Sequence, residues 1–568
     1  MNNTAGELPA ELRADIDAYE REIQRFLSGE MPAAILKAKR VPRGVYEQRK
    51  DGTYMVRARV TAGVLTSDQV QKMSDLSSTL GDGILHVTTR QDVQLHGICI
   101  QDTPKVMRGL LDAGLTTKGG GGNTVRNITA CPYAGVCPQE CFDVTKHAYA
   151  VTAYLIQLTG SYNLPRKYKI SFSGCRTDCG LAQISDLGFV SGIRNGQPGF
   201  RVFAAGGMGA NSRIASLLLE WTPAEEVIRI AETIRRLFDR YGDRKNKNRA
   251  RLRFVIDRLG EKEFRREFDD EIKRVVTDGV PQYIASGDVL NQSDQGYRSP
   301  VAHEDGIRYL EQRQTGLTTV PLHLQLGLIS SEDFINLARL ASRFSGEQGL
   351  HTTRAQGLQM RFVKSDNLPL LAAELRKLKT DFISANLPQQ HFISCAGAAT
   401  CRLGLCLSRN ALIACDVKLR TAGLAGKGLD GFSVYVNGCP NACGHQPIAP
   451  IGLSGSAQRV SGRLVPFYRV TMGGRCDSLG ARFGLPIGQV PAKALPGFVT
   501  EVARDYIGHH TDGENFSAYF ERAGREHFVA IVDRHKSVPP FNDSPDFYRD
   551  FGSDEPFSLA GRGAGEHG

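Results

Sequence analysis

Cys395-Ala-Gly-Ala-Ala-Thr-Cys401, followed by Asn437-Gly-Cys439-Pro-Asn441-Ala-Cys443-Gly444, is the part of the sequence from which the fold can be read. It holds four thiols in two close pairs, and 37 residues separate the pairs. Glycine and proline around the second pair favour tight turns, which can aim several thiolates at one point. Four cysteine thiolates are the usual ligands of an iron–sulfur cluster, whereas zinc ribbons prefer intervals of two to four residues within each pair. The stretch therefore predicts a cluster site rather than a set of inert, packed thiols.

The four cysteines belong to an internal repeat with a period of 264 residues. Subtracting 264 from each number again gives cysteines, namely Cys131, Cys137, Cys175 and Cys179. The same shift matches Gly63 with Gly327, and Thr88-Thr-Arg90 with Thr352-Thr-Arg354. The chain is therefore two copies of one unit. We expect a pseudo-twofold axis, with a site where the copies meet.

Each copy opens with the same order of elements. In the first copy, Tyr54–Val60 alternates like a strand, Gly63 turns the chain, and Thr66 with Gln69 forms a capping-box pattern. The predicted helix ends by Gly81, and a second strand follows over Ile84–Thr89. The second copy predicts a strand over Pro321–Leu326, a cap at Ser330, a helix to Ser345 and a strand over Leu350–Thr353. Each copy thus opens with an α/β half-domain that pairs with its twin.

Length and composition limit the classes of protein. The chain has 568 residues, with 41% hydrophobic and 23% charged, as soluble globular proteins have. We see no signal peptide, and no apolar run approaches the ~20 residues of a membrane span. Thirteen cysteines without a secretion signal indicate a reducing compartment, and we expect the cytoplasm. The net charge of +10 is spread along the chain, which favours acidic partners but predicts neither nucleic-acid nor membrane binding.

Basic residues of the first copy mark a possible anion site. Arg90 follows a predicted strand, and Arg126 follows the four-glycine loop 119–122, where backbone can approach a ligand closely. Lys167 and Lys169 alternate along an extended segment and so share one face. Most such side chains are solvated surface charges. However, the second copy has Gln390, Gly431 and Ser433 at the positions that correspond to Arg126, Lys167 and Lys169. This asymmetry predicts one anion-binding site between the copies.

From about Phe26 to Arg549 the chain resembles the sirohaem-dependent sulfite and nitrite reductase family. The resemblance rests on Thr88-Thr-Arg-Gln91, Asn123-Thr-Val-Arg126-Asn127, Leu164-Pro-Arg-Lys-Tyr-Lys169 and the two cysteine motifs. It implies an α/β (α+β) fold in which two ferredoxin-like half-domains pair and two further α/β domains bind sirohaem and cluster. It also implies that a [4Fe–4S] cluster is bound by Cys395, Cys401, Cys439 and Cys443.

The same resemblance assigns roles around the haem. Cys443, with Asn441 beside it, would hold the sirohaem iron and so join haem and cluster through one thiolate. Arg90, Arg126, Lys167 and Lys169 would bind the substrate anion as the catalytic cations. Arg244 and Lys245 open a basic run over residues 244–251 that could bind sirohaem carboxylates, although a solvated helix face explains this run equally well.

The resemblance implies an oxidoreductase that delivers six electrons to its substrate. Sulfite reduction to sulfide is the preferred prediction, because the fourth cation is usually Lys in sulfite reductases and often Asn in ferredoxin-type nitrite reductases, and here it is Lys169. Nitrite reduction to ammonia is the alternative. Since no flavin or nicotinamide module is visible, we expect a separate donor, either a ferredoxin or a flavoprotein subunit. A non-catalytic iron–sulfur electron carrier is the rival from another class, but it would not need cations in one copy only.

The first-copy quartet departs from the family, which usually keeps cluster cysteines in the second copy alone. Two interpretations stay open for Cys131, Cys137, Cys175 and Cys179: a second [4Fe–4S] cluster, or thiols that merely pack after the duplication. The expected domains are an N-terminal extension (1–45), half-domains over 46–120 and 306–385, cofactor-binding α/β domains over 121–305 and 386–545, and a flexible tail (546–568).

Overall fold

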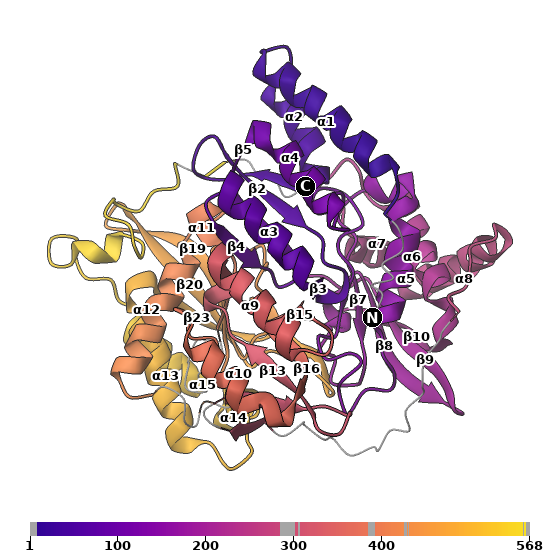
Figure 1. Cartoon of the computed structure of the whole chain (residues 1–568). Helices are drawn as coiled ribbons and strands as arrows, with labels where there is room; N and C mark the ends of the chain where they lie inside the picture. The colour runs from indigo at the N-terminus through magenta and orange to yellow at the C-terminus, as the bar shows by residue number, and fades with distance from the viewer. Residues whose placement is uncertain are drawn as a thin grey trace.

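The structure is a computed structural model that describes residues 8–284, 301–304, 307–383, 392–424, 429, 431–560 and 562–563. Two half-domains occupy its middle, where helices α3 (Ser67–Leu80) and α9 (Ser331–Phe344) lie side by side (Figure 1). The remaining elements of the first half-domain are β1 (Val45–Glu47), β2 (Thr53–Ala58), β3 (Val64–Thr66), β4 (Ile84–Val87), β5 (Val93–Cys99) and α4 (Thr103–Asp112). Those of the second are β11 (Val301–Glu304), β12 (Ile307–Glu311), β13 (Leu317–Leu322), β14 (Leu328–Ser330), β15 (Gly349–Thr352), β16 (Leu358–Lys364) and α10 (Leu368–Arg376).

The two half-domains exchange an edge strand. One sheet has the order β1-β2-β5-β4-β14, and the other has the order β11-β12-β13-β16-β15-β3. Strand β14 of the second copy therefore completes the first sheet, with Leu328 opposite His86, and β3 completes the second, with Leu65 opposite Leu350. Apolar residues of both copies share one core beneath α3 and α9. This confirms the predicted pairing of the half-domains and fixes the two copies relative to each other.

The predicted helix starts are confirmed in both copies. The Thr66 hydroxyl accepts the backbone N–H of Gln69 at 3.2 Å, and the Gln69 side chain accepts the N–H of Thr66 at 3.1 Å, which is a capping box. Ser330 caps α9 in the same way, through the N–H of Asp333 at 3.0 Å. The strand predicted over Pro321–Leu326 instead ends at Leu322, because Leu326 has a left-handed φ of 55° that a strand cannot contain.

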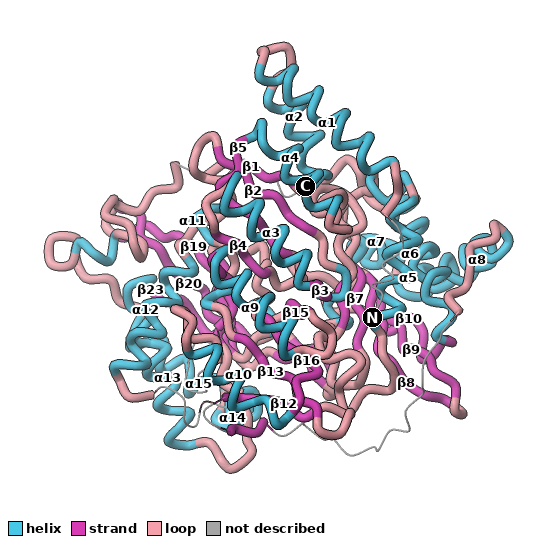
Figure 2. Tube along the Cα trace, viewed as in Figure 1, coloured by secondary structure: helices cyan, strands magenta, loops and turns pink. Residues whose placement is uncertain are grey.

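Each half-domain leads into a larger α/β domain built on a five-stranded sheet, and Figure 2 separates the helices from the strands of these domains. The first domain contains β6 (Thr129–Ala130), α5 (Thr145–Gln157), β7 (Ile170–Ser173), β8 (Leu187–Arg194), β9 (Gln197–Ala204), β10 (Ser216–Pro223), α6 (Val227–Tyr241), α7 (Leu252–Leu259) and α8 (Glu261–Thr277). The second contains β17 (Phe392–Ser394), α11 (Gly397–Thr400), α12 (Ser408–Thr421), β18 (Val434–Asn437), β19 (Ile451–Val460), β20 (Arg463–Met472), β21 (Arg475–Asp477), β22 (Gly480–Arg482), β23 (Leu485–Pro491), α13 (Leu495–His509), α14 (Phe516–Ala523) and α15 (Arg525–His535).

The two α/β sheets have matching orders, β10-β9-β8-β7-β6 and β23-β20-β19-β18-β17. In both, the first two strands pair in parallel in the same register, so that Thr129 faces Ser171 and Ile393 faces Tyr435. Parallel neighbours end at the same sheet edge, and all eight repeat cysteines lie in or just after the loops at that edge. The repeat therefore reproduces one cysteine-bearing edge in each copy.

Both chain ends pack against this frame. Helices α1 (Glu11–Leu27) and α2 (Ala33–Arg40) cover the first half-domain, and Tyr19 and Ile23 are fully buried there. The predicted flexible tail is in part packed, because Tyr548 is buried and the Asp550 carboxylate accepts the N–H of Leu407 at 2.7 Å. None of the helices within the described ranges combines the length and the apolar character that crossing a membrane requires.

Candidate functional site

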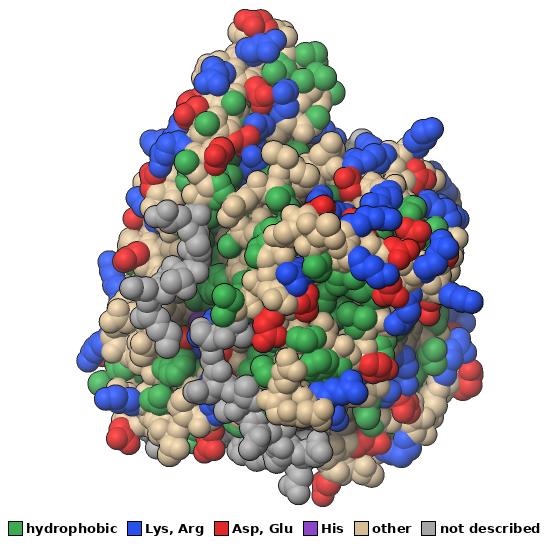
Figure 3. All heavy atoms as spheres, turned by 90° about the vertical axis from the view of Figure 1, so that its right-hand side faces the viewer, with side chains coloured by type: hydrophobic (Ala, Val, Ile, Leu, Met, Phe, Trp, Pro, Cys, Tyr) green, Lys and Arg blue, Asp and Glu red, His purple; other side chains and the backbone are tan. Residues whose placement is uncertain are grey.

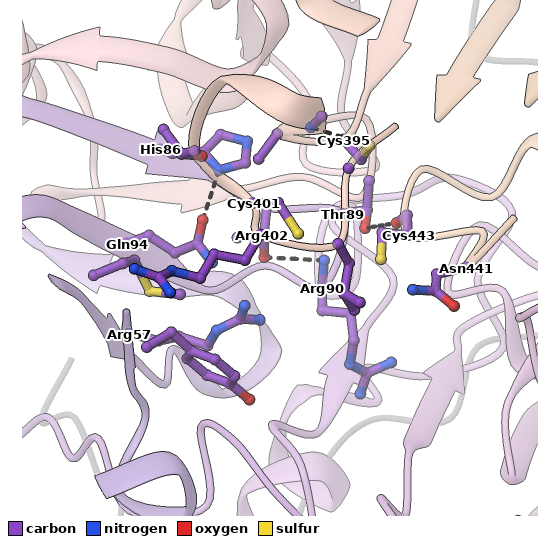
Figure 4. Close-up of a pocket in the computed structure, with 18 of the residues that line it drawn as sticks. Arg57, His86, Thr89, Arg90, Gln94, Cys395, Cys401, Arg402, Asn441 and Cys443 are labelled. Atoms are coloured by element: carbon purple, nitrogen blue, oxygen red, sulfur yellow. Dashed lines mark hydrogen bonds between the residues drawn. The ribbon is translucent and has the colours of Figure 1, made fainter. Parts of the chain in front are cut away.

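A cavity of about 390 Å³ lies between the two copies. Its lining joins residues of both half-domains with the cysteine loops of the second α/β domain. The labelled residues of Figure 4 come from the first half-domain and from the second α/β domain. The four second-copy cysteines and the four predicted cations all line it: Cys395, Cys401, Cys439, Cys443, Arg90, Arg126, Lys167 and Lys169. The structure thus brings together the two sets of residues that the sequence placed in different copies.

Backbone N–H groups hold the second-copy sulfur atoms in place. The Cys395 sulfur accepts the N–H of Gly397 at 3.3 Å and that of Gly438 at 3.2 Å. Cys401 and Cys439 likewise accept backbone N–H groups from the residues just after them. Hydrogen bonds to sulfur are one means by which a protein positions and tunes a cluster. The loops are therefore shaped around sulfur ligands.

Metal binding would change the protonation state of these thiols. Burial raises the pKa of Cys401 to about 11 and that of Cys439 to about 12, and the neighbouring Cys443 is the next cause for both. Without metal these thiols are neutral near pH 7, whereas iron binds thiolates. Cluster assembly would therefore release the protons of these thiols.

One contact links the copies directly at the cysteine edge. The Thr89 hydroxyl, at the end of β4, donates to the Cys443 carbonyl at 2.8 Å (Figure 4). The next residue, Arg90, is buried, and its guanidinium donates to the Asn127 carbonyl. Burial lowers the pKa of Arg90 to about 9, with nearby Arg354 as the next cause. The turn after β4 therefore brings Arg90 into the same cavity as Cys443, whose thiol the resemblance assigns to the haem.

Arg126 is held by the glycine loop that precedes it. Its guanidinium donates to the Gly120 carbonyl at 2.9 Å and to the Gly122 carbonyl at 3.0 Å. A Cβ atom at Gly121 would lie only 2.0 Å from the Val41 carbonyl oxygen, so this turn requires glycine. The glycine loop thus wraps an arginine that lines the cavity.

Lys167 and Lys169 flank the buried Tyr168 in an extended segment just before β7. The predicted alternation is confirmed, because both ammonium-bearing side chains line the cavity while Tyr168 packs into the domain core. Burial is the largest cause that lowers the pKa of each lysine well below its ordinary value. The next causes are positive neighbours, Arg251 for Lys167 and Arg90 for Lys169. A crowded, enclosed set of cations is stabilised when an anion enters.

The second copy forms a corresponding cavity of about 590 Å³ without these lysines. Gly431, Ser433 and Arg354 line it, at the positions that correspond to Lys167, Lys169 and Arg90. The Arg354 guanidinium is engaged by Thr129 Oγ1 at 2.7 Å and the Gly180 carbonyl at 2.7 Å. Gln390, the counterpart of Arg126, lies outside the described residues. The difference in basic residues between the two copies is therefore a difference between the residues that line the two cavities.

Four arginines that line the cavity were not predicted as site residues: Arg57, Arg166, Arg402 and Arg562. Arg57 lies on β2, Arg166 precedes Lys167, and Arg402 follows Cys401. Arg402 is tied across the copies to Glu47 at 2.7 Å. Adjacency to Lys167 and Cys401 was the available signal for two of them. Arg57 carries no such signal, because only the register of β2 brings it to the cavity.

Two predicted cofactor ligands lie elsewhere. Arg244 and Lys245 are exposed and are not among the residues that line either large cavity. The Arg244 guanidinium pairs with Asp239 and donates to the Asn163 carbonyl at 2.8 Å. Of the same run, Arg251 is buried against Asp186 at 2.8 Å and adds its charge beside Lys167. Basic and acidic side chains are interspersed on the face that carries α8 (Figure 3).

The cavity fits a cluster and a polyanionic macrocycle. Two arginines that line it keep an unused buried donor, since Arg57 Nε and Arg90 Nε find no acceptor among the described residues. Within the same residues, no three His, Cys, Asp or Glu side chains converge closely enough for a single metal ion. A [4Fe–4S] cluster places its four ligands around a cube, which needs wider spacing than a zinc ion does. The four thiols around an open space match the cluster.

Comparison with known families gives two matches. The family model described as "Nitrite and sulphite reductase 4Fe-4S domain" matches residues 121–276. The model described as "Nitrite/Sulfite reductase ferredoxin-like half domain" matches residues 46–113 and 310–378. These two ranges of the half-domain model coincide with the paired half-domains around α3 and α9.

Similar proteins agree with this assignment. The ferredoxin–nitrite reductase of Synechococcus elongatus is 31% identical over 436 residues, covering 75% of this chain and 80% of the relative. The assimilatory ferredoxin-dependent nitrite reductase of Haloferax mediterranei is 27% identical and covers 90% of both chains. The solved structure of the Mycobacterium tuberculosis NirA protein superposes with a TM-score of 0.78 at 25% identity, covering 93% of this chain and 98% of that one. The fold predicted from the repeat is thereby confirmed.

Proposed function

The chain belongs to the nitrite and sulphite reductase family, and on that premise we propose that it reduces nitrite to ammonia with electrons from a reduced ferredoxin. The choice of nitrite and of ferredoxin follows the names of the relatives in Synechococcus elongatus and Haloferax mediterranei. It reverses the preference for sulfite that Lys169 suggested.

One observation carries the proposal: a single cavity contains the second-copy thiols and the first-copy cations. An electron carrier needs the thiols but not the cations. Because burying like charges together is unfavourable, their retention indicates an anionic ligand that offsets the cost. This argues for a reductase rather than a carrier.

The residues that would hold the cofactors are those around the open space. Cys395, Cys401, Cys439 and Cys443 would bind the [4Fe–4S] cluster, and Cys443 would also face the sirohaem, whose carboxylates suit Arg57, Arg166 and Arg402. When bound, the cluster and the sirohaem supply single electrons to the substrate.

The protein's own contribution is charge and protons. Arg90 and Arg126 are fixed by backbone carbonyls, so they orient the anion without moving. Lys167 and Lys169 have lowered pKa values and can gain a proton when the anion binds and give it to a departing oxygen. Nitrite reduction consumes protons with every pair of electrons, so two lysines next to the substrate serve as donors.

Sulfite reduction to sulfide is the second candidate, and Lys169 favours it. A fourth cation in the cavity suits a dianion better than a monoanion, because each added positive charge interacts with both negative charges. The same cofactors and the same six-electron stoichiometry would serve either anion.

Purified holoenzyme with reduced ferredoxin would be given nitrite and sulfite in separate assays, and ammonia and sulfide would be measured. We expect a higher kcat/KM for nitrite. The variant Lys169→Asn should lower sulfite turnover more than nitrite turnover, by about tenfold in their ratio for each ~1.4 kcal/mol of lost interaction. If the wild type reduces sulfite better, sulfite replaces nitrite as the substrate. If it reduces neither, the proposal fails.

A further inference from the structure

The first-copy quartet forms a second convergence of sulfur atoms. Cys131 and Cys137 follow β6, and Cys175 and Cys179 follow β7, so two neighbouring loops approach each other. The Cys131 and Cys179 thiols lie within hydrogen-bonding reach of each other, as do those of Cys137 and Cys175. Both contacts join different loops. Packing of isolated small hydrophobes does not require this paired arrangement.

The backbone around the quartet repeats that of the second copy in detail. The N–H of Gln139 donates to the Cys137 sulfur at 3.4 Å, as the N–H of Leu403 does to Cys401. At the other loop, Thr177 N–H donates to Cys175, and its counterpart Asn441 donates to Cys439. Each pair of donors is separated by the repeat period of 264. The same N–H groups therefore face sulfur at both sites.

The turn geometry is conserved between the copies as well. Asp178 adopts a left-handed φ of 55°, and its counterpart Ala442 has 54°. Such a conformation is strained for residues other than glycine, so two unrelated side chains share it only because the turn is the same. The Asp178 carboxylate holds this turn through the N–H groups of Ala182 at 2.7 Å and Gln183 at 3.1 Å. The loop that carries Cys175 and Cys179 is thus stabilised in the same shape as its counterpart in the second copy.

The first site also faces a cavity as the second site does. Cys179 lines the cavity of about 590 Å³, and its counterpart Cys443 lines the cavity of about 390 Å³. Arg308 and Arg354 line the larger one and supply positive charge near the thiols. A cluster bound by four thiolates is anionic, and such charge stabilises it.

We propose that Cys131, Cys137, Cys175 and Cys179 bind a second [4Fe–4S] cluster. This site does not reduce the anion, because Gly431 and Ser433 occupy the positions of the two cavity lysines. It is a redox centre beside a cavity that lacks the two lysines. The proposal is independent of whether nitrite or sulfite is the substrate.

Counting metal in anaerobically purified holoenzyme tests this directly. We expect about nine irons and about eight acid-labile sulfides per chain, taking four irons per cluster and one for the haem, and Mössbauer spectra with two cluster components. About five irons with four sulfides would overturn the proposal. One zinc per chain in addition to about five irons would also overturn the proposal, because the quartet would then bind zinc. Two disulfides found by thiol counting would overturn it as well, because the four thiols would then be paired with each other.

Matched variants separate the two sites. The double variant Cys137→Ser with Cys175→Ser should lose about four irons but keep the haem absorption bands, whereas Cys99→Ser, at an exposed cysteine, should lose none. Iron content that is unchanged in the double variant would contradict the proposal. If the double variant does not fold, the iron and sulfide counts of the wild type still decide. Failure of this test leaves the nitrite proposal intact, because that proposal depends on turnover at the other cavity.

Discussion

In the proposed function, the anion chemistry depends on Lys167 and Lys169. They lie in the same cavity as Arg90 and Arg126. Burial is the largest cause that lowers the pKa of both lysines, followed by Arg251 for Lys167 and by Arg90 for Lys169. An enclosed anion removes that penalty. The structure therefore explains why the basic residues of one copy are retained: they are unfavourable alone and favourable with a negatively charged ligand.

Replacing Lys167 tests this role. Lys167→Gln keeps the approximate size of the side chain but removes its charge and its acidic proton. We expect kcat/KM for nitrite to fall by about 10²-fold, the usual effect of losing one electrostatic or proton-donating group. Steady-state assays with reduced ferredoxin measure it. Lys262→Gln, on exposed α8, is the matched control and should be unchanged. An equal loss in both variants would show that the effect is not specific to the cavity.

Anion binding should depend on pH in a direction that follows from the lysine pKa values. A bound anion raises the lowered pKa of Lys167 and Lys169 toward about 10.5, so binding takes up protons between the two values. Affinity is full below the lowered pKa and falls as pH rises through this window. Titration of the haem absorption with nitrite across pH would reveal it. A flat profile, or affinity that rises with pH, would contradict the assignment.

At the residue scale, the motifs located the cysteines and four of the cations. They could not locate Arg57, because its position depends on strand pairing between β2 and β5 rather than on any local pattern. They also drew attention to Arg244 and Lys245, where local charge density says nothing about which side of the domain a turn faces. A local motif therefore identifies the type of side chain in a site better than it predicts whether that side chain lies in the site.

Among the elements, α3 and α9 hold the two copies together. Each starts at a capped residue, Thr66 or Ser330, and each of these residues ends a strand that crosses into the other copy's sheet. The capping patterns were readable from sequence. The exchange of β3 and β14 was not, because a three-residue strand carries no signal that identifies its partner.

Removing one cap should loosen this junction. Thr66→Ala leaves the N–H of Gln69 without its acceptor, and we expect the free energy of unfolding of the half-domains to fall by about 1 kcal/mol. Hydrogen exchange within α3 reports the change, and iron content should stay constant. Ser330→Ala is the counterpart and should act equally on α9. Loss of the cluster in either variant, or no change in exchange, would contradict this account of the junction.

For the molecule as a whole, duplication and divergence explain the site. Both copies keep the cysteine edge, the turn geometry and a cavity, but one cavity has the lysines and the other does not. The repeat of 264 residues predicted that both copies have the same fold. The absence of the cations from the second copy predicted that the first copy supplies the basic residues of the site. The size of the second cavity could not be foreseen, since it depends on how side chains of three domains pack.

In the proposed function, first-copy cations and second-copy thiols form one site that delivers six electrons to an anion. The stoichiometry of turnover tests this most directly, with reduced ferredoxin consumed and ammonia formed measured together in purified holoenzyme. We expect six reduced ferredoxins to be consumed per ammonia, with no free intermediate. Oxidation of ferredoxin without ammonia from nitrite or sulfide from sulfite would contradict it.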